Sequence, residues 1–222
     1  MILSIETSTK ICSVALSEGS DILAYREDRS NSYSHAELLN VFIHEVMKNR
    51  DYGDLQAVAV SEGPGSYTGL RIGVSAAKGL AFALDIPVIS VSTLRSMAQS
   101  VATQNGSLLI PMIDARRMEV FCAGYNHLNE AVFPTRAEIL DDSSFPEFKG
   151  FERGYFFGDG AEKCKPILEP LGLEFKPGIY ASAKDMAPIA SAKFTRGEFV
   201  DLAYFEPYYL KDFVAGKPKK TK

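Results

Sequence analysis

"MILSIETSTKICSVALSE" (residues 1–18) decides the fold, because its pattern returns in the second half of the chain as "LLIPMIDARRMEVFCAGY" (residues 108–125). Each segment begins with an apolar strand that ends in one carboxylate, Glu6 in the first and Asp114 in the second. Each then passes through a polar turn into a strand that carries a cysteine. We interpret the two segments as the openings of two copies of one structural unit.

The first copy has the pattern of a mixed α/β unit. The expected elements are strands at 2–7, 12–19 and 21–28, a helix at 34–50, a strand at 55–65, a helix from residue 68, a strand at 86–93 and a helix at 93–102. The turn at Gly19 favours a hairpin, so the first strands should be antiparallel. Ser34 and Glu37 have the spacing of a capping box, and Thr93 is expected to cap the last helix. The later strand–helix–strand segment should be parallel and right-handed.

The second copy continues with a strand, a Gly158-Asp159-Gly160 turn and a helix over 154–172. A further helix is expected at 182–194, capped by Ser182 and kinked by Pro188. Two such units predict a duplicated actin-like (ASKHA, ribonuclease-H-like) α/β fold with two lobes and mixed sheets. The expected ranges are a first lobe at 1–102, a second lobe at 103–214 whose last segment packs back on the first, and a disordered basic tail at 215–222.

Composition restricts the classes of function. The 222 residues are 46% hydrophobic and 23% charged, an ordinary balance for a globular protein. The formal net charge of -4 repels a phosphate backbone, so contact with nucleic acid requires a local patch or a partner. No leader and no apolar run near the roughly 20 residues of a membrane span are present. Cys12, Cys122 and Cys164 form no CxxC motif, which predicts buried thiols in a reducing cytoplasm.

The glycine-rich segment "SEGPGSYTGLRIGVSAAKGLAFAL" (61–84) does not match the known phosphate loops. A Walker loop requires Gly-Lys-Ser/Thr, whereas Gly69 is followed by Leu70 and Arg71. The next strand lacks the terminal acid of a dinucleotide site, and Ser66 is off-centre for a nucleophile elbow. A tight turn between strand and helix, with no ligand, remains an equal alternative.

The helix that follows carries only two charges between residues 69 and 84, Arg71 and Lys78. A helix that is apolar nearly all round is either enclosed or bound to a partner. One interpretation is that the helix at 34–50 covers part of this apolar helix, and the other is that a second protein covers it. Both interpretations hold if the two helices together leave an exposed apolar surface. The predicted partner interface consists of Leu38, Leu39, Phe42, Gly69, Leu70, Arg71, Gly73, Val74, Ala77 and Ala81.

Catalytic groups are sparse. His35 and His44 are nine residues apart, so they cannot share a metal as an HExxH pair does, and His35 is expected to be exposed. Glu6 and Asp114 are the best pair of carboxylates, because the duplicated turns of an actin-like fold face each other across a cleft. A plain pair of strand ends explains them equally well, and no glycine nest accompanies them. We therefore predict a vestigial nucleotide loop and neither a metal nor a cofactor. Its residues are Glu6, Thr7, Ser8, Thr9 and Asp114.

Four segments, "ILSIETSTKICSVAL", "VSEGPGSYTGLRIGVSAAKGLAFALDIPVISVSTL", "IDARRMEVF" and "EPYYLK", resemble the bacterial TsaB family, also called YeaZ. The resemblance implies a non-catalytic paralogue of TsaD, the subunit that transfers threonylcarbamoyl to adenosine 37 of tRNA. It implies a heterodimer with TsaD through the helices at 34–50 and 69–84, and recruitment of the ATPase TsaE by that complex. A homodimer through the same surface is a further expectation. Contact with tRNA is expected to be indirect only, with the lysines of the tail solvated.

TsaD-type proteins carry a Val-Asn-His-Leu-x-x-His pattern, and Thr93 and Met97 stand at its histidine positions here. A hydroxyl and a thioether do not replace an imidazole pair as ligands of iron or zinc. The family often has Asp where this chain has Glu6, which weakens a magnesium role further. Two alternatives stay open at this point: an autonomous ATPase or kinase that uses Glu6, Thr9 and Asp114, and a metallopeptidase.

Overall fold

The computed structural model describes residues 1–30, 34–141, 143–148, 151 and 153–211. It contains two five-stranded sheets with the orders β3-β2-β1-β4-β5 and β10-β9-β6-β7-β8. The strands of the first sheet are β1 (Ile2–Glu6), β2 (Cys12–Glu18), β3 (Asp21–Asp28), β4 (Ala57–Gly63) and β5 (Val88–Ser92). Those of the second are β6 (Ser107–Asp114), β7 (Glu119–Tyr125), β8 (Ala131–Ile139), β9 (Arg153–Phe157) and β10 (Glu174–Phe175).

The two sheets have the same topology, which confirms the predicted duplication. In each sheet the opening strand pairs antiparallel with the next, as β1 with β2 and β6 with β7. Each opening strand also pairs in parallel with the fourth strand of its copy, β4 or β9. Reversing the second order to β8-β7-β6-β9-β10 therefore superposes it on the first, strand for strand.

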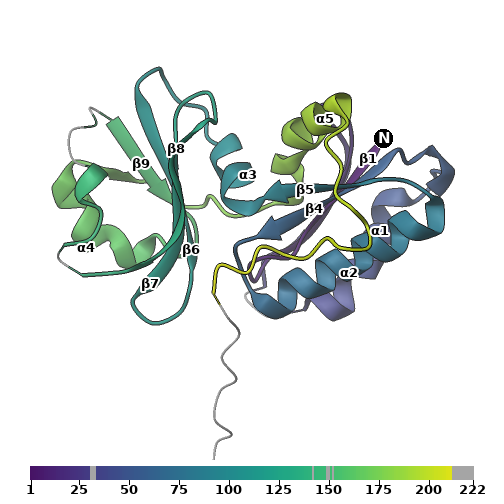
Figure 1. Cartoon of the computed structure of the whole chain (residues 1–222), viewed down its shortest axis with the longest axis horizontal. Helices are drawn as coiled ribbons and strands as arrows, with labels where there is room; N and C mark the ends of the chain where they lie inside the picture. The colour runs from purple at the N-terminus through teal and green to yellow at the C-terminus, as the bar shows by residue number, and fades with distance from the viewer. Residues whose placement is uncertain (31–33, 142, 149–150, 152, 212–222) are drawn as a thin grey trace, which may run out of the picture.

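The described α-helices are α1 (His35–Met47), α2 (Tyr67–Leu84), α3 (Thr93–Gln99), α4 (Lys165–Leu168) and α5 (Ala187–Arg196). Helices α1 and α2 cover one face of the first sheet, and α5 with the 3-10 turn Ala183–Met186 covers the other. Helix α3 packs with the second sheet, and its Leu94 and Met97 lie in the apolar cluster that lines one face of that sheet. Figure 1 shows the sheets side by side, with the C-terminal segment running back along α2.

Several local predictions were wrong. Ser34 makes no capping hydrogen bond, because its hydroxyl donates instead to Asp28 Oδ2 at 2.7 Å. Helix α3 is capped by Ser92, one residue before the predicted Thr93. Ser182 makes no capping hydrogen bond either, because its hydroxyl donates to Glu27 Oε2. Pro188 does not kink the helix, because it lies in the first turn of α5, where proline is tolerated. The helix predicted within 154–172 is broken into short turns around α4, and β8 was not predicted.

The contact that orders the first lobe joins the β1–β2 turn to the start of α2. Thr7 Oγ1 donates a hydrogen bond to Gly69 O at 2.8 Å, and Ser66 N–H donates to Ser8 O at 2.6 Å. A Cβ atom on Gly69 would lie 2.1 Å from Thr7 O, and one on Gly73 would lie 2.2 Å from Thr7 Oγ1. Glycine is thus required at position 69 because two backbones approach each other closely, and at position 73 because the Thr7 hydroxyl fills the space of a side chain.

We expect Gly69→Ala to lower the free energy of unfolding by about 1–3 kcal/mol, because the added methyl group overlaps the Thr7 carbonyl. Gly79→Ala on the same helix is the matched control, since a Cβ there meets no atom within 4 Å. The control should gain up to about 1 kcal/mol of stability from better helix propensity. Urea denaturation measures the free energy of unfolding of both variants. Equal midpoints for the two variants would contradict the close contact between Gly69 and Thr7.

Candidate functional site

The turns of the two copies face each other across a cavity of about 510 Å³ between the lobes. Thr9, Lys10 and Arg29 line it from the first lobe. Asp114, Asp159 and Glu162 line it from the second. Of the five residues of the predicted nucleotide loop, the cavity therefore holds Thr9 and Asp114.

Glu6, Thr7 and Ser8 are buried and do not line that cavity. Glu6 Oε1 accepts a hydrogen bond from Ser8 N–H at 2.7 Å, while its Oε2 has no partner. Burial raises the pKa of Glu6, although the hydrogen bonds around it act in the opposite direction. The Thr7 hydroxyl donates its hydrogen bond to Gly69 O. These groups hold the turn against α2, so they are not placed to cradle a phosphate.

The charged groups around the cavity are largely neutralised within the chain. Asp114 pairs with Lys163 at 2.5 Å and Glu162 pairs with Lys165 at 2.7 Å. Of the cations that line the cavity, Lys176 pairs with Glu174 and Arg29 pairs with Glu27. A cleft with such internal pairing offers little net charge for binding a magnesium–nucleotide complex.

Asp159 lines the cavity from the Gly158–Gly160 turn. Its Oδ1 accepts a hydrogen bond from Asp114 N–H at 3.1 Å, and burial raises the pKa of its carboxyl group. Gly158 has a φ of 111°, and a Cβ there would lie 2.1 Å from Met112 O. The Gly-Asp-Gly turn therefore docks on the end of β6, and only the glycine spacing signals this in the sequence.

Reactive side chains are shielded. Burial raises the pKa of each of the three thiols, Cys12, Cys122 and Cys164, to about 12, so none is a ready nucleophile at neutral pH. Thr93 and Met97, which stand at the histidine positions of TsaD, are buried in the interior. Across the described ranges there is no group of three or more His, Cys, Asp or Glu residues that is arranged to hold a metal.

The prediction that His35 is exposed was wrong. Its exposed fraction is 2%, because the β1–β2 turn lies over it and its Nε2 is 2.8 Å from Thr9 O. Burial lowers the pKa of the imidazole. His35 thus supports the turn from the side of α1 and is not a surface group.

The predicted partner interface is mostly interior. Seven of its ten residues are buried within the chain, against the first sheet and the β1–β2 turn. They are Leu39, Gly69, Leu70, Gly73, Val74, Ala77 and Ala81. Leu38 and Phe42 are half-buried, and Arg71 is exposed. The sequence pattern identified the apolar helix correctly but selected its inward side.

A different stripe of α2 faces outward. Arg71, Ser75, Gly79 and Phe82 follow one another at intervals of four, four and three residues, and all are exposed. Phe82 has an exposed fraction of 79%, and Val41 on the neighbouring α1 has one of 47%. We call the surface formed by Leu38, Val41, Phe42, Ser75, Gly79 and Phe82 the α1–α2 face.

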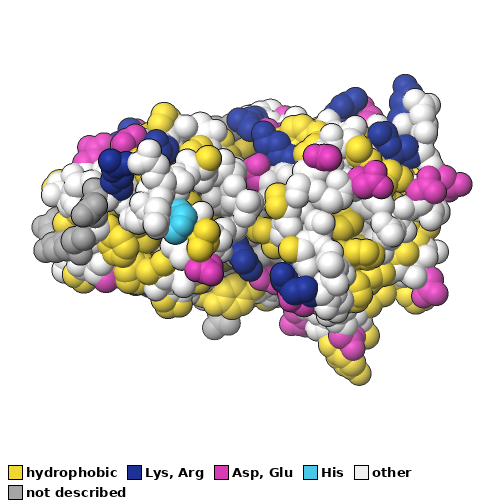
Figure 2. Space-filling view, turned by 90° about the horizontal axis from the view of Figure 1, so that it is seen from above, with side chains coloured by type: hydrophobic (Ala, Val, Ile, Leu, Met, Phe, Trp, Pro, Cys, Tyr) yellow, Lys and Arg dark blue, Asp and Glu magenta, His cyan; other side chains and the backbone are white. Residues whose placement is uncertain are grey.

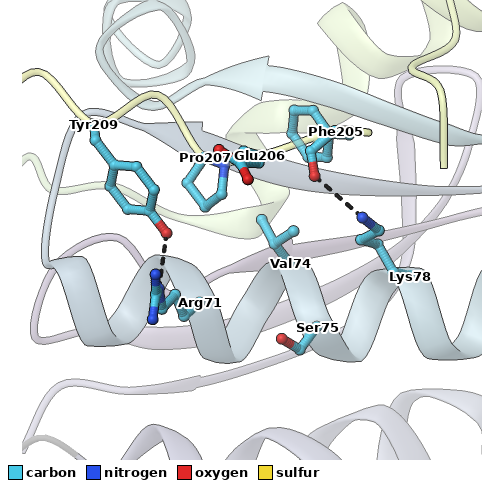
Figure 3. A pocket seen from close by; sticks show the side chains of 8 residues that line it. All are labelled: Arg71, Val74, Ser75, Lys78, Phe205, Glu206, Pro207 and Tyr209. Atoms are coloured by element: carbon cyan, nitrogen blue, oxygen red, sulfur yellow. Dashed lines mark hydrogen bonds between the residues drawn. The ribbon is translucent and has the colours of Figure 1, made fainter. Parts of the chain in front are cut away.

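The C-terminal segment borders α2 (Figure 3). Arg71 Nε donates to the Tyr209 hydroxyl at 3.1 Å, and Lys78 Nζ donates to Phe205 O at 3.1 Å. Between these contacts lies a hollow of about 320 Å³ in which Glu206 and Pro207 face α2. The segment thereby covers one margin of α2 and leaves Gly79 and Phe82 uncovered.

Comparison with known proteins shows extensive similarity. A family model for TsaD, tRNA N6-adenosine threonylcarbamoyltransferase, matches residues 29–147. The tRNA threonylcarbamoyladenosine biosynthesis protein TsaB of Escherichia coli is 32% identical over 97% of this chain and 96% of that relative. The solved structure of YeaZ from Pseudomonas aeruginosa has a TM-score of 0.77 at 26% identity, covering 94% of this chain and 99% of its own.

A more distant structure shows the same fold without close relationship. The activator of 2-hydroxyisocaproyl-CoA dehydratase from Clostridium difficile has a TM-score of 0.53 at 9% identity and covers 90% of this chain and 98% of its own. Together with the repeated sheet topology, these structures confirm the predicted duplicated actin-like fold.

Replacing Glu6 tests whether the buried carboxylate serves only the fold. Because burial raises its pKa above the ordinary 4.5, the folded chain holds this proton more tightly than the unfolded chain does. The cost of ionising Glu6 is therefore absent below pH 4.5 and grows as the pH rises through the raised pKa. We expect Glu6→Gln to gain on the order of 1 kcal/mol of stability near pH 8 and nothing near pH 4.

Urea unfolding at both pH values measures the difference. Glu18→Gln, at an exposed carboxylate on the end of β2, is the control and should show no such dependence on pH. A loss of stability in Glu6→Gln near pH 8 would mean that the charge itself is needed.

Proposed function

Because the chain belongs to the TsaB family, also called YeaZ, we propose that it serves tRNA threonylcarbamoyladenosine biosynthesis as a non-catalytic subunit that binds TsaD. Its participation in that biosynthesis follows from the family. The partner and the absence of catalysis are the proposal. The observation that carries the proposal is the uncovered C-terminal part of α2, around Gly79 and Phe82.

No contact of the described chain requires glycine at position 79. Gly69 and Gly73 are required by contacts with Thr7, whereas a Cβ on Gly79 would meet open space. Glycine inside a helix costs up to about 1 kcal/mol relative to alanine. A partner backbone that approaches α2 closely explains why a side chain is missing at this exposed position.

The surroundings of Gly79 suit a protein partner. Phe82 lies about one turn further along α2 with most of its ring in solvent, and Val41 exposes a second apolar side chain on α1. An uncovered aromatic group beside small residues is typical of an interface anchor. TsaD, as the paralogue, is the proposed occupant. A homodimer through the same face would compete with it, and TsaE would join through the complex.

A non-catalytic role is supported by the state of the cleft. Its carboxylates Asp114 and Glu162 are paired with lysines, and Glu6 is buried away from the cavity. These features count against the autonomous ATPase or kinase. The replacement of the histidine pair by Thr93 and Met97 counts against the metallopeptidase. None of the described helices is long and apolar enough to cross a bilayer.

Phe82→Asp and Gly79→Gln should each reduce TsaD affinity at least about ten-fold. The aspartate would have to lose its water in the interface, and the glutamine side chain would occupy the space into which the partner backbone fits. Both variants should keep the wild-type melting temperature within a few degrees, because neither side chain packs inside the chain. Affinity is measured by titration with purified TsaD, and co-purification gives the qualitative result.

Ile139→Asp is the matched control, because Ile139 is 70% exposed on β8 of the other lobe. It should bind TsaD as the wild type does. Unchanged binding by both α2 variants would refute the α1–α2 face as the site.

A further inference from the structure

The turn between β6 and β7 holds two consecutive arginines in an unfavourable backbone conformation. Arg116 has a φ of 69° and Arg117 a φ of 48°, both in the left-handed region. Two such residues in a hairpin turn strongly favour Asn-Gly, because a Cβ atom crowds the following carbonyl oxygen in this conformation. Arginines that persist at a strained turn indicate a function outside the fold.

The strain is offset by groups beneath the turn. Lys163 Nζ donates to Arg117 O at 2.8 Å and to Glu119 O at 2.6 Å, and Asp114 Oδ1 accepts from Arg116 N–H at 3.0 Å. All of these contacts involve the backbone of the turn. Across the part of the chain that the structure describes, neither guanidinium has a hydrogen bond or an ion pair, and both residues are exposed. The fold thus presents two unpaired cations on a rigid support.

Another cation of the described chain lies at this hairpin. Lys211, the last described residue, pairs with Glu119. In Figure 1 the C-terminal segment reaches the lower end of the second sheet, where β6 and β7 are joined. The face seen in Figure 2 carries positive and negative side chains interspersed over both lobes.

We propose that Arg116 and Arg117 bind phosphate groups of the tRNA backbone, so that this chain contacts the RNA directly. The inference rests on the proposed function, because that function brings a tRNA to the complex. Guanidinium groups bind phosphate oxygens in a bidentate manner. With a net charge of -4 the chain requires a local patch for this contact, and the turn supplies one.

The test measures binding of a fluorescent tRNA transcript that carries adenosine 37, with the full chain alone and with its TsaD complex. Arg116→Gln/Arg117→Gln should weaken binding about ten-fold and flatten the slope of log K against log salt by about 1.5 between roughly 50 and 200 mM KCl. Arg153→Gln/Arg196→Gln removes the same charge from exposed positions on β9 and α5. This control should leave the slope unchanged.

A second variant separates recognition from folding. Arg116→Asn/Arg117→Gly relaxes the turn, so its melting temperature should rise by about 2–4 °C while tRNA binding falls as in the glutamine variant. A structural role for the arginines would make stability fall as well.

Three results would overturn the inference. The first is unchanged tRNA binding by the arginine variants, and the second is an equal loss of tRNA binding in the control. The third is a loss of TsaD affinity without a loss of tRNA affinity, which would mean that the turn binds an acidic protein surface. TsaD affinity is measured separately, so failure of the α1–α2 face is distinguished from failure of the turn. The salt series on the chain alone remains interpretable in either case.

Discussion

The close approach between the β1–β2 turn and the first residues of α2 governs the first lobe. Thr7 and Ser8 bind the backbone at Ser66 and Gly69, and glycine makes that approach sterically possible. The same contact uses the hydroxyl of Thr7, which an actin-like phosphate loop would direct into the cleft. It also fixes the rotation of α2, which places Gly79 and Phe82 outward. One packing requirement thereby accounts both for the burial of Thr7 and Ser8 away from the cavity and for the direction of the surface proposed to bind TsaD.

The duplication has given the two corresponding turns different environments. The β1–β2 turn is enclosed by α1 and α2, with His35 supporting it from below. The β6–β7 turn has no such helices over it, and Lys163 organises its backbone instead. Asp114 therefore stabilises the backbone of a turn whose arginines are exposed, whereas its counterpart Glu6 is buried. The internal symmetry of the fold does not extend to the chemistry of its turns.

Sequence periodicity and glycine punctuation were sufficient to predict the duplication, the order of most strands and the position of α2. They could not tell the inward from the outward side of α2, because small apolar residues occupy both sides: Ala77 is buried and Ala83 is exposed. His35 was misplaced for a related reason, since the residue that buries it, Thr9, is distant in sequence. The pairing of Asp114 with Lys163 and the docking of the Gly158–Gly160 turn likewise depend on tertiary contacts. Strand β8 lacks a clear alternating pattern, because it is an edge strand with Pro134 in it.

The chain closes its first sheet with its last helix. Ile89 and Val91 remain uncovered until Met186 and Ile189 pack on them, and Val200 then pairs with Val88. During synthesis the ribosome must therefore release nearly the whole polypeptide before the amino-terminal half can bury its second apolar surface. The two halves are therefore expected to acquire their native structure as one cooperative event.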